Sequence, residues 1–207
     1  MNRRIFLALL GSLAVPARTA LAAGPEEADA ARFVDAVVAA GLATMHDKAL
    51  SPAEREQRFA SLLTAKFDLP RIARYVLGRY WIGASDDERR TFAALFGRWV
   101  VRSYSGRLSQ YSQETMKVTG ARAKSGSGAI VASVIVHPQG PPTNVEWRVE
   151  RGTEGWRIVD IDVEGVSMAL TEREEIAAVI QRDGGTVAAL NRSLADKLRG
   201  ETADAAH

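Results

Sequence analysis

Four short strand-like segments, separated by turn residues, occupy the middle of the chain and limit its possible folds more than any other feature. They cover Glu114–Ala123, Ala129–His137, Asn144–Arg151 and Gly155–Val163. Glycine or proline lies in each connection, as in Ser125–Gly128 and Pro138–Pro142, which is typical of hairpins. Because hairpins join antiparallel neighbours, we expect a twisted antiparallel sheet of about four strands.

The side-chain pattern within these segments predicts how each strand is placed. Residues 130–136 are apolar at nearly every position, which predicts a central strand covered on both faces. Val145, Trp147 and Val149 alternate with charged residues, so their strand has one buried face. In the last segment the apolar parity switches after Ile158, which predicts a bulge or strong twist there.

Helical periodicity flanks the sheet on both sides. The predicted helices are Glu26–His46, one that begins at the capping box Ser51–Glu54, Arg71–Leu77 ended by Gly78, one from Ser85 to about Tyr111, and two capped by Thr171 and Thr186. Helices around an antiparallel meander make an α+β fold. We expect a single domain over residues 25–198 that encloses an apolar cavity, and a disordered polar tail over residues 199–207.

The first 22 residues have the pattern of an export signal. Arg3 and Arg4 precede the short apolar run Ile5–Val15, and Ala20-Leu-Ala22 is a small-x-small cleavage site. We expect cleavage after Ala22 or after Ala23. The arginine pair leaves export by the twin-arginine route open beside the general secretory route.

Charge and cysteine content narrow the function classes. The chain has 27 Lys and Arg against 25 Asp and Glu, and loss of Arg3, Arg4 and Arg18 with the leader leaves 24 against 25. This balance argues against a nucleic-acid partner, which requires a basic patch. With no cysteine, an exported domain is held together by its core alone.

The segment Gly165–Ala169 imitates the G-x-S-x-G turn of serine hydrolases, with Ser167 as the nucleophile. Such a serine needs a histidine base. His46 and His137 precede Ser167, whereas in α/β-hydrolases the histidine follows, and His207 lies in the predicted tail. We therefore expect Ser167 to be structural and the protein not to be an enzyme.

Asp160, Asp162 and Glu164 share one face of the last strand. They could hold a metal or form an acid–base pair, but an ion pair with Arg148 or Arg157 across the sheet is the favoured interpretation. We predict no metal site and no cofactor. The aromatic residues that recur at helical spacing, such as Phe92, fit either a plain core or a cavity wall, and periodicity does not separate the two.

Three stretches together resemble one family. They are Phe67–Trp81, Ser85–Tyr111 with its Phe-x-x-x-Phe pair, and the closing strand with Trp156, Asp160 and Glu164–Met168. In order and spacing these are similar to the MlaC, or toluene-tolerance, family of periplasmic lipid-binding proteins, over roughly residues 30–198. Chains of this type include the hopanoid-associated HpnM subfamily.

The resemblance implies a monomeric periplasmic carrier without enzymatic activity. Its lipid, a phospholipid or a hopanoid, would keep its tails in the cavity and its headgroup outside. The implied partners are an inner-membrane transporter and an outer-membrane lipoprotein or porin complex, which would contact a cavity mouth near Arg79, Tyr80 and Trp81.

The predicted cavity wall combines apolar positions of the long helix, the sheet and their neighbours. It consists of Val76, Tyr80, Phe96, Val100, Tyr104, Val134, Val136, Val145, Trp147, Ile161 and Val166. Two alternatives stay open. One is a small cavity enzyme of the ketosteroid-isomerase kind, which requires a carboxyl group with a raised pKa in the cavity, and Asp160 is its candidate. The other is an adaptor that binds only protein.

Overall fold

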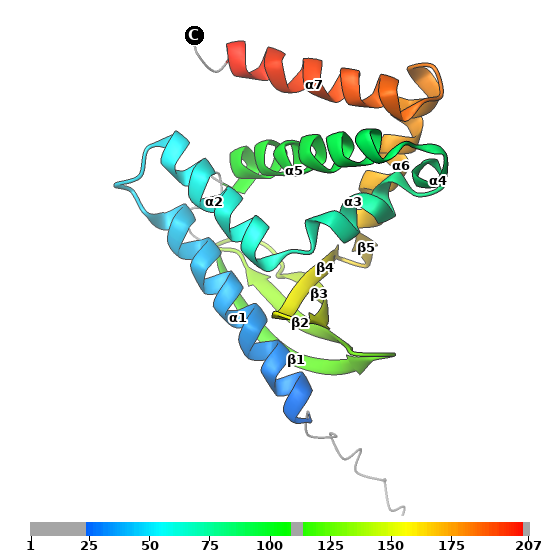
Figure 1. The fold of residues 1–207 in the computed structure, drawn as a ribbon. Helices are drawn as coiled ribbons and strands as arrows, with labels where there is room; N and C mark the ends of the chain where they lie inside the picture. The colour runs from blue at the N-terminus through cyan, green and yellow to red at the C-terminus, as the bar shows by residue number, and fades with distance from the viewer. Residues whose placement is uncertain (1–23, 109–113, 205–207) are drawn as a thin grey trace, which may run out of the picture.

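A computed structural model describes residues 24–108 and 114–204, which form the α+β fold in Figure 1. The helices are α1 (Pro25–His46), α2 (Pro52–Lys66), α3 (Leu69–Leu77), α4 (Tyr80–Gly83), α5 (Asp86–Leu108), α6 (Met168–Arg182) and α7 (Val187–Asp204). The strands are β1 (Thr115–Lys124), β2 (Gly128–Val136), β3 (Thr143–Gly152), β4 (Gly155–Val163) and β5 (Val166–Ser167). In Figure 1, α1 runs across the sheet, and α2, α3 and α5 lie between the sheet and α7.

The sheet is an antiparallel meander in the order β1-β2-β3-β4-β5. The four predicted strands are confirmed, and the two-residue β5 is added to them. Arg148 pairs with Asp160 and its neighbour Val149 pairs with Ile158, so Val159 is the extra residue of a bulge. The predicted parity switch near Ile158 is therefore confirmed, and it turns Ile161 and Val163 toward the same side as Trp147.

Local capping explains where most helices begin. Ser51 and Glu54 form the predicted capping box of α2, and the Asp68 carboxylate accepts the Arg71 backbone N–H at the start of α3. Gly78 ends α3 with a φ of 55°, a conformation that glycine adopts without a Cβ penalty.

The start of α6 corrects the prediction. Thr171 is not the cap, because Ser167 takes that place and its side chain accepts a hydrogen bond from the Leu170 backbone N–H. Thr171 lies one turn inside the helix, and its hydroxyl donates to the Ser167 carbonyl at 3.0 Å. Ser167 and Thr171, four residues apart, both have side chains that can cap a helix. The turn after β4 places Ser167 at the N-cap position.

The helix ends also differ from expectation. Helix α7 continues past Leu198 to Asp204, so the helix extends into the segment predicted as a disordered tail. Helix α4 was not predicted. The expected leader, the predicted helix end at Tyr111 and His207 lie outside the described residues. Among the described helices, none has the length and hydropathy needed to span a membrane.

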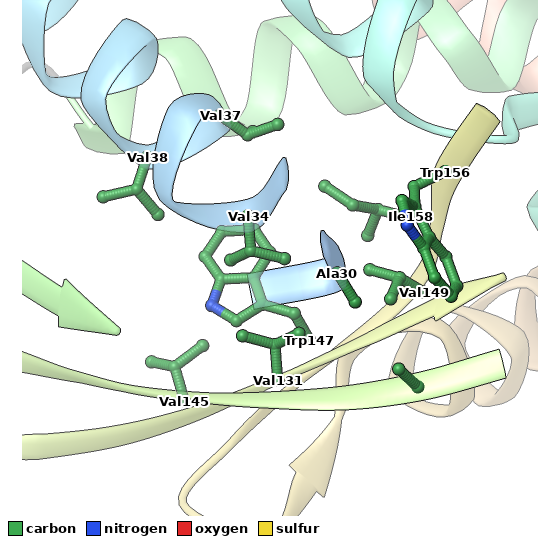
Figure 2. Close-up of a cluster of buried hydrophobic side chains, with 11 residues drawn as sticks. Ala30, Val34, Val37, Val38, Val131, Val145, Trp147, Val149, Trp156 and Ile158 are labelled. Atoms are coloured by element: carbon green, nitrogen blue, oxygen red, sulfur yellow. The ribbon is translucent and has the colours of Figure 1, made fainter. Parts of the chain in front are cut away.

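Two separate hydrophobic cores hold the fold together. Figure 2 shows the first, in which Ala30 and Val34 of α1 pack on the sheet residues Val131, Trp147 and Ile158. The second joins α3, α5, α6 and α7, and its members include Ala73, Val76, Leu77, Phe92, Phe96, Ile176, Ile180, Leu190 and Leu194. The rings of Phe92 and Phe96 stack with their centroids 5.6 Å apart. The sheet and the helical layer are therefore each packed independently.

The outer face of the sheet is charged rather than covered. On this face Arg122 pairs with Glu146 at 2.9 Å, and Val136 of β2 is 42% exposed. The prediction that β2 is covered on both faces is wrong, because α1 covers only the face that carries Val131.

Asp29 ties α1 to the far end of the sheet. Its carboxylate accepts the Trp156 indole N–H at 2.9 Å and pairs with Arg151. The bond from Trp156, and after it the bond from Arg151, lower the pKa of Asp29 below its ordinary 3.8.

We expect the stabilisation from the Asp29 charge to be present above pH 3.8 and to be lost as the pH falls below that value. Asp29→Asn keeps an acceptor for Trp156 but removes the charge. The melting temperature of wild type should exceed that of Asp29→Asn near neutral pH, and the gap should close as acid protonates Asp29. A gap independent of pH would show that the charge contributes nothing.

Candidate functional site

An apolar cavity of about 340 Å³ lies between the two cores. Its lining residues are Val37, Val38, Gly41, Leu42 and Met45 of α1, Phe59, Leu62 and Leu63 of α2, Phe67, Leu69 and Ile72 around the start of α3, Phe96, Val100 and Tyr104 of α5, Met116, Ile135, Val145, Trp147, Val159, Asp160, Ile161 and Val163 of the sheet, and Met168, Ala169 and Glu172 of α6. Helices α1, α2, α3, α5 and α6 and the sheet thus all contribute to one hollow.

The wall of the cavity is chemically uniform. Of its lining residues, Tyr104, Trp147, Asp160 and Glu172 have nitrogen or oxygen in their side chains. The Tyr104 hydroxyl donates to the Glu172 carboxylate at 3.2 Å, and the Trp147 indole N–H donates to the Ser133 hydroxyl at 2.8 Å. Such a surface favours a long apolar ligand, since nearly every wall atom gains contact without losing a hydrogen bond.

Six of the predicted wall residues line this cavity: Phe96, Val100, Tyr104, Val145, Trp147 and Ile161. The three residues on α5 are spaced by four, which places them on one helix face. The other three lie on the inward face of β3 and β4, where Trp147 pairs with Ile161 and Val145 with Val163.

The other five predicted residues lie elsewhere. Val134 and Val136 are on the outer face of β2, because strand side chains alternate and Val131 and Ile135 are the ones that point inward. Val166 is 57% exposed on β5. Val76 is buried in the second core, and Tyr80 packs against the edge of that core.

The lining residues of α1 and α2 were not predicted. Residues such as Val38, Leu42, Phe59 and Leu62 recur at helical spacing, which is equally typical of an ordinary core. Among the strand residues, Ile135 was missed and Val134 was wrongly included. Both errors have one cause: in a run of apolar residues the sequence does not show which alternate residues face inward.

Hydrogen bonds of Asp160 and Ser167 join β4 to the start of α6. The Ser167 hydroxyl donates to one Asp160 oxygen at 2.7 Å, while the other oxygen accepts the Ala169 backbone N–H at 3.0 Å. Ser167 also caps α6 through Leu170. Of the described histidines, His137 contacts the Thr143 hydroxyl at 3.0 Å. The hydrogen-bond partners of the Ser167 hydroxyl are therefore the Asp160 carboxylate and the Leu170 backbone N–H, which fix a turn.

Two of the three acidic residues, Asp160 and Asp162, face Arg148 as the favoured interpretation predicted, whereas Glu164 lies in the turn after β4 and its carboxylate accepts the Asn144 backbone N–H. Arg148 lies 3.6 Å from Asp160 and 3.4 Å from Asp162, whereas Arg157 pairs with Glu154 at 2.8 Å. Asp160 accepts hydrogen bonds at both oxygens, an arrangement that holds a carboxylate in place. Over the described ranges, no cluster of three or more His, Asp or Glu side chains is arranged to hold a metal ion.

Ser167→Ala should lower the free energy of unfolding by about 1 kcal/mol, because α6 loses its N-cap and Asp160 loses a donor. The cavity lining should be unaffected. Urea unfolding measures the loss, and a fluorophosphonate probe supplies the contrasting test. Covalent labelling of Ser167 by that probe would overturn the structural role.

Arginine and exposed apolar side chains gather where α3, α4 and α6 meet, at one end of the molecule in Figure 1. Arg173 stacks on Tyr75 at 5.2 Å, Arg79 stacks on Tyr80 at 4.9 Å, and Ile82 is 83% exposed. We call this the α4 surface, made of Arg74, Tyr75, Arg79, Ile82, Leu170 and Arg173. None of these six residues lines the cavity. Tyr80 and Trp81 do not line it either, so the predicted mouth at residues 79–81 is not part of the cavity lining.

The protein is similar to known proteins in both fold and sequence. A phospholipid-binding protein from Ralstonia solanacearum, solved in complex with a phospholipid, has the same fold with a TM-score of 0.71 and 24% identity, covering 83% of this chain and 97% of that one. The toluene tolerance protein ttg2D of Pseudomonas putida is 24% identical over 106 residues, which span 51% of this chain and about half of the relative, 49%. The family model for MlaC proteins matches residues 34–196, and the chain therefore belongs to the MlaC family.

Proposed function

We propose that this protein is a periplasmic lipid carrier that holds lipid tails in the apolar cavity. The single observation that carries the proposal is the wall itself, which draws on both cores and carries few polar atoms. The membership of the MlaC family supports the same conclusion. So does the solved relative that binds a phospholipid, because its chain has the same fold.

The energetics suit reversible, non-covalent carriage. Each methylene group removed from water contributes about 0.8 kcal/mol, so a dozen or more of them hold a lipid without any bond to the protein. The headgroup would stay outside, and a phospholipid is the first candidate and a hopanoid the second. Spontaneous release into water would be slow for the same reason.

The test is native mass spectrometry of protein purified from its host. A mass increment that dissociates as one intact lipid is expected, and organic extraction identifies it. Protein that carries no lipid, and takes none from liposomes, would contradict the proposal. Turnover of a ketosteroid without lipid uptake would favour the cavity-enzyme alternative with Asp160 as its base.

Export is part of the proposal. Removal of residues 1–22 or 1–23 should leave a mature protein that starts at Ala23 or Gly24 in the periplasmic fraction. N-terminal sequencing of protein from the native host checks this. Retention of Met1 on periplasmic protein would contradict cleavage.

Delivery would need membrane-bound partners that loosen the cavity. The α4 surface suits that contact, since Arg74, Arg79 and Arg173 make no ion pair with a carboxylate among the described residues. Helix α6 links this surface to the cavity, because Leu170 is 44% exposed while Met168 and Ala169 line the cavity. The partners proposed are an inner-membrane transporter and an outer-membrane lipoprotein or porin complex.

A further inference from the structure

The first turn of α6 separates the cavity from solvent. Met168, Ala169 and Glu172 line the cavity. Leu170, which lies between them, and Val166, which precedes them, are both exposed. Within a few positions of one chain segment, residues that face the cavity therefore alternate with residues that face water. An outward shift of this segment would open the cavity.

Side chains at the end of the sheet hold this turn in place. The first backbone N–H groups of an α-helix have no partner within the helix, and two of those in α6 are bound by side chains. The Ala169 N–H donates to the Asp160 carboxylate at 3.0 Å, and the Leu170 N–H donates to the Ser167 hydroxyl at 3.1 Å. Because the Ser167 hydroxyl itself donates to Asp160 at 2.7 Å, both bonds depend on one carboxylate.

Asp160 is in turn fixed by the sheet. It pairs with Arg148 in the strand register, so the two side chains leave the sheet on the same face, and the Arg148 guanidinium lies 3.6 Å from the carboxylate. The Ile161 backbone N–H also donates to it, at 2.9 Å. A negative charge at the N-terminus of α6 is favourable as well, because it complements the helix dipole. The start of α6 is therefore attached to a well-held carboxylate.

Asp162 allows a direct comparison with Asp160. It lies two residues further along β4 and faces the same Arg148, at 3.4 Å. Both aspartate side chains are 12% exposed. Within the described part of the chain, however, the Asp162 side chain makes its hydrogen bond to Arg148 and makes none to α6. The two carboxylates share a strand, an ion-pair partner and their burial, and they differ in the contact with α6.

We propose that Asp160 is a positioning residue that keeps the α6 side of the cavity closed and thereby sets the rate at which a bound lipid escapes without a partner. When the first turn of α6 separates from Asp160, Met168 and Ala169 leave the cavity wall and water reaches the tails. The same helix carries Arg173 of the α4 surface, so a partner that docks there acts on the element that Asp160 holds. This inference rests on the proposed carrier function, because it concerns release of the same lipid.

The test measures how fast loaded protein loses lipid to bare liposomes. Protein is loaded with phosphatidylglycerol that carries one fluorescent acyl chain and is mixed with an excess of phosphatidylcholine vesicles. Asp160→Ala removes both acceptor oxygens, and release should be at least about tenfold faster than from wild type, since a hydrogen bond to a charged group contributes at least that factor. Asp160→Asn keeps the size of the side chain and one acceptor oxygen, so its rate should lie between the two and tests the same contact if the alanine variant does not fold.

Asp162→Ala is the matched control, because it removes the other carboxylate beside Arg148 and should release lipid at the wild-type rate. Hydrogen exchange gives a second readout, in which the Ala169 N–H should exchange faster in both Asp160 variants and at the wild-type rate in Asp162→Ala. Wild-type release from both Asp160 variants, or equal acceleration in Asp162→Ala, would overturn the role of Asp160 while leaving the carrier function intact. Wild type that takes up none of the labelled lipid would overturn both.

Discussion

Replacing Val100 by glutamate should abolish lipid retention. Val100 faces the cavity from the middle of α5, where a carboxylate would have to be buried against acyl chains or keep the cavity hydrated. Burying an uncompensated charge costs several kcal/mol, so retention should fall by at least about 100-fold. Native mass spectrometry of protein exposed to liposomes measures the loss.

The design separates binding from folding. Glutamate is a better helix former than valine, and Val100 is half-buried rather than fully packed, so α5 should persist. Val136→Glu introduces the same change on the outer face of β2, where Val136 is 42% exposed, and should keep wild-type lipid. A Val100→Glu protein with native circular dichroism and full lipid occupancy would show that this cavity does not hold the tails.

Most of the fold could be predicted from turn residues and helix caps. The hairpin connections and the capping box at Ser51 act through neighbours in the chain, and each lies where residue types alone place it. The bulge at Val159 follows Ile158, where the apolar parity of the sequence switches. These features determine strand order and helix boundaries. They do not determine which side of the sheet is covered, which is why β2 was predicted with two buried faces.

The site was harder to predict because it depends on contacts between distant segments. Val134 and Ile135 are equally apolar, and only the position of α1 on the sheet decides that Ile135 faces the cavity. Likewise, the stripes on α1 and α2 have the spacing of any buried helix face. A cavity differs from a core in the unfilled space between two packed layers. The spacing of apolar residues along the chain is the same in both cases.

Asp160 illustrates how context changes the meaning of a motif. From sequence it is the candidate for an unusual carboxyl group, and Ser167 is the candidate nucleophile. The structure brings the two together at 2.7 Å, and the backbone N–H of Ala169 adds to the same carboxylate. The pair therefore fixes the angle at which α6 leaves the sheet, so that Met168 and Ala169 reach the cavity while Leu170 stays outside.

This arrangement leads to a second large expected effect, on delivery rather than binding. In the double variant Arg79→Glu and Ile82→Glu, lipid occupancy should stay at the wild-type level, because neither residue lines the cavity. Transfer to vesicles that carry the partner complex should fall at least about tenfold, since charge reversal and loss of an exposed apolar anchor each remove interface energy. Trp81 is a poorer choice, because it packs against the second core and its ring contacts Arg89 at 5.3 Å.

The matched control is again Val136→Glu, which adds a carboxylate to an exposed valine away from the α4 surface. Lipid-loaded proteins are mixed with bare liposomes and with partner-bearing ones, and transfer is followed by a fluorescent acyl chain. Wild type should deliver rapidly only to the partner-bearing vesicles, because unassisted release exposes the tails to water. Equal transfer to both kinds of vesicle would contradict partner-gated release, whereas equal transfer by wild type and the double variant would place the docking site elsewhere on the protein.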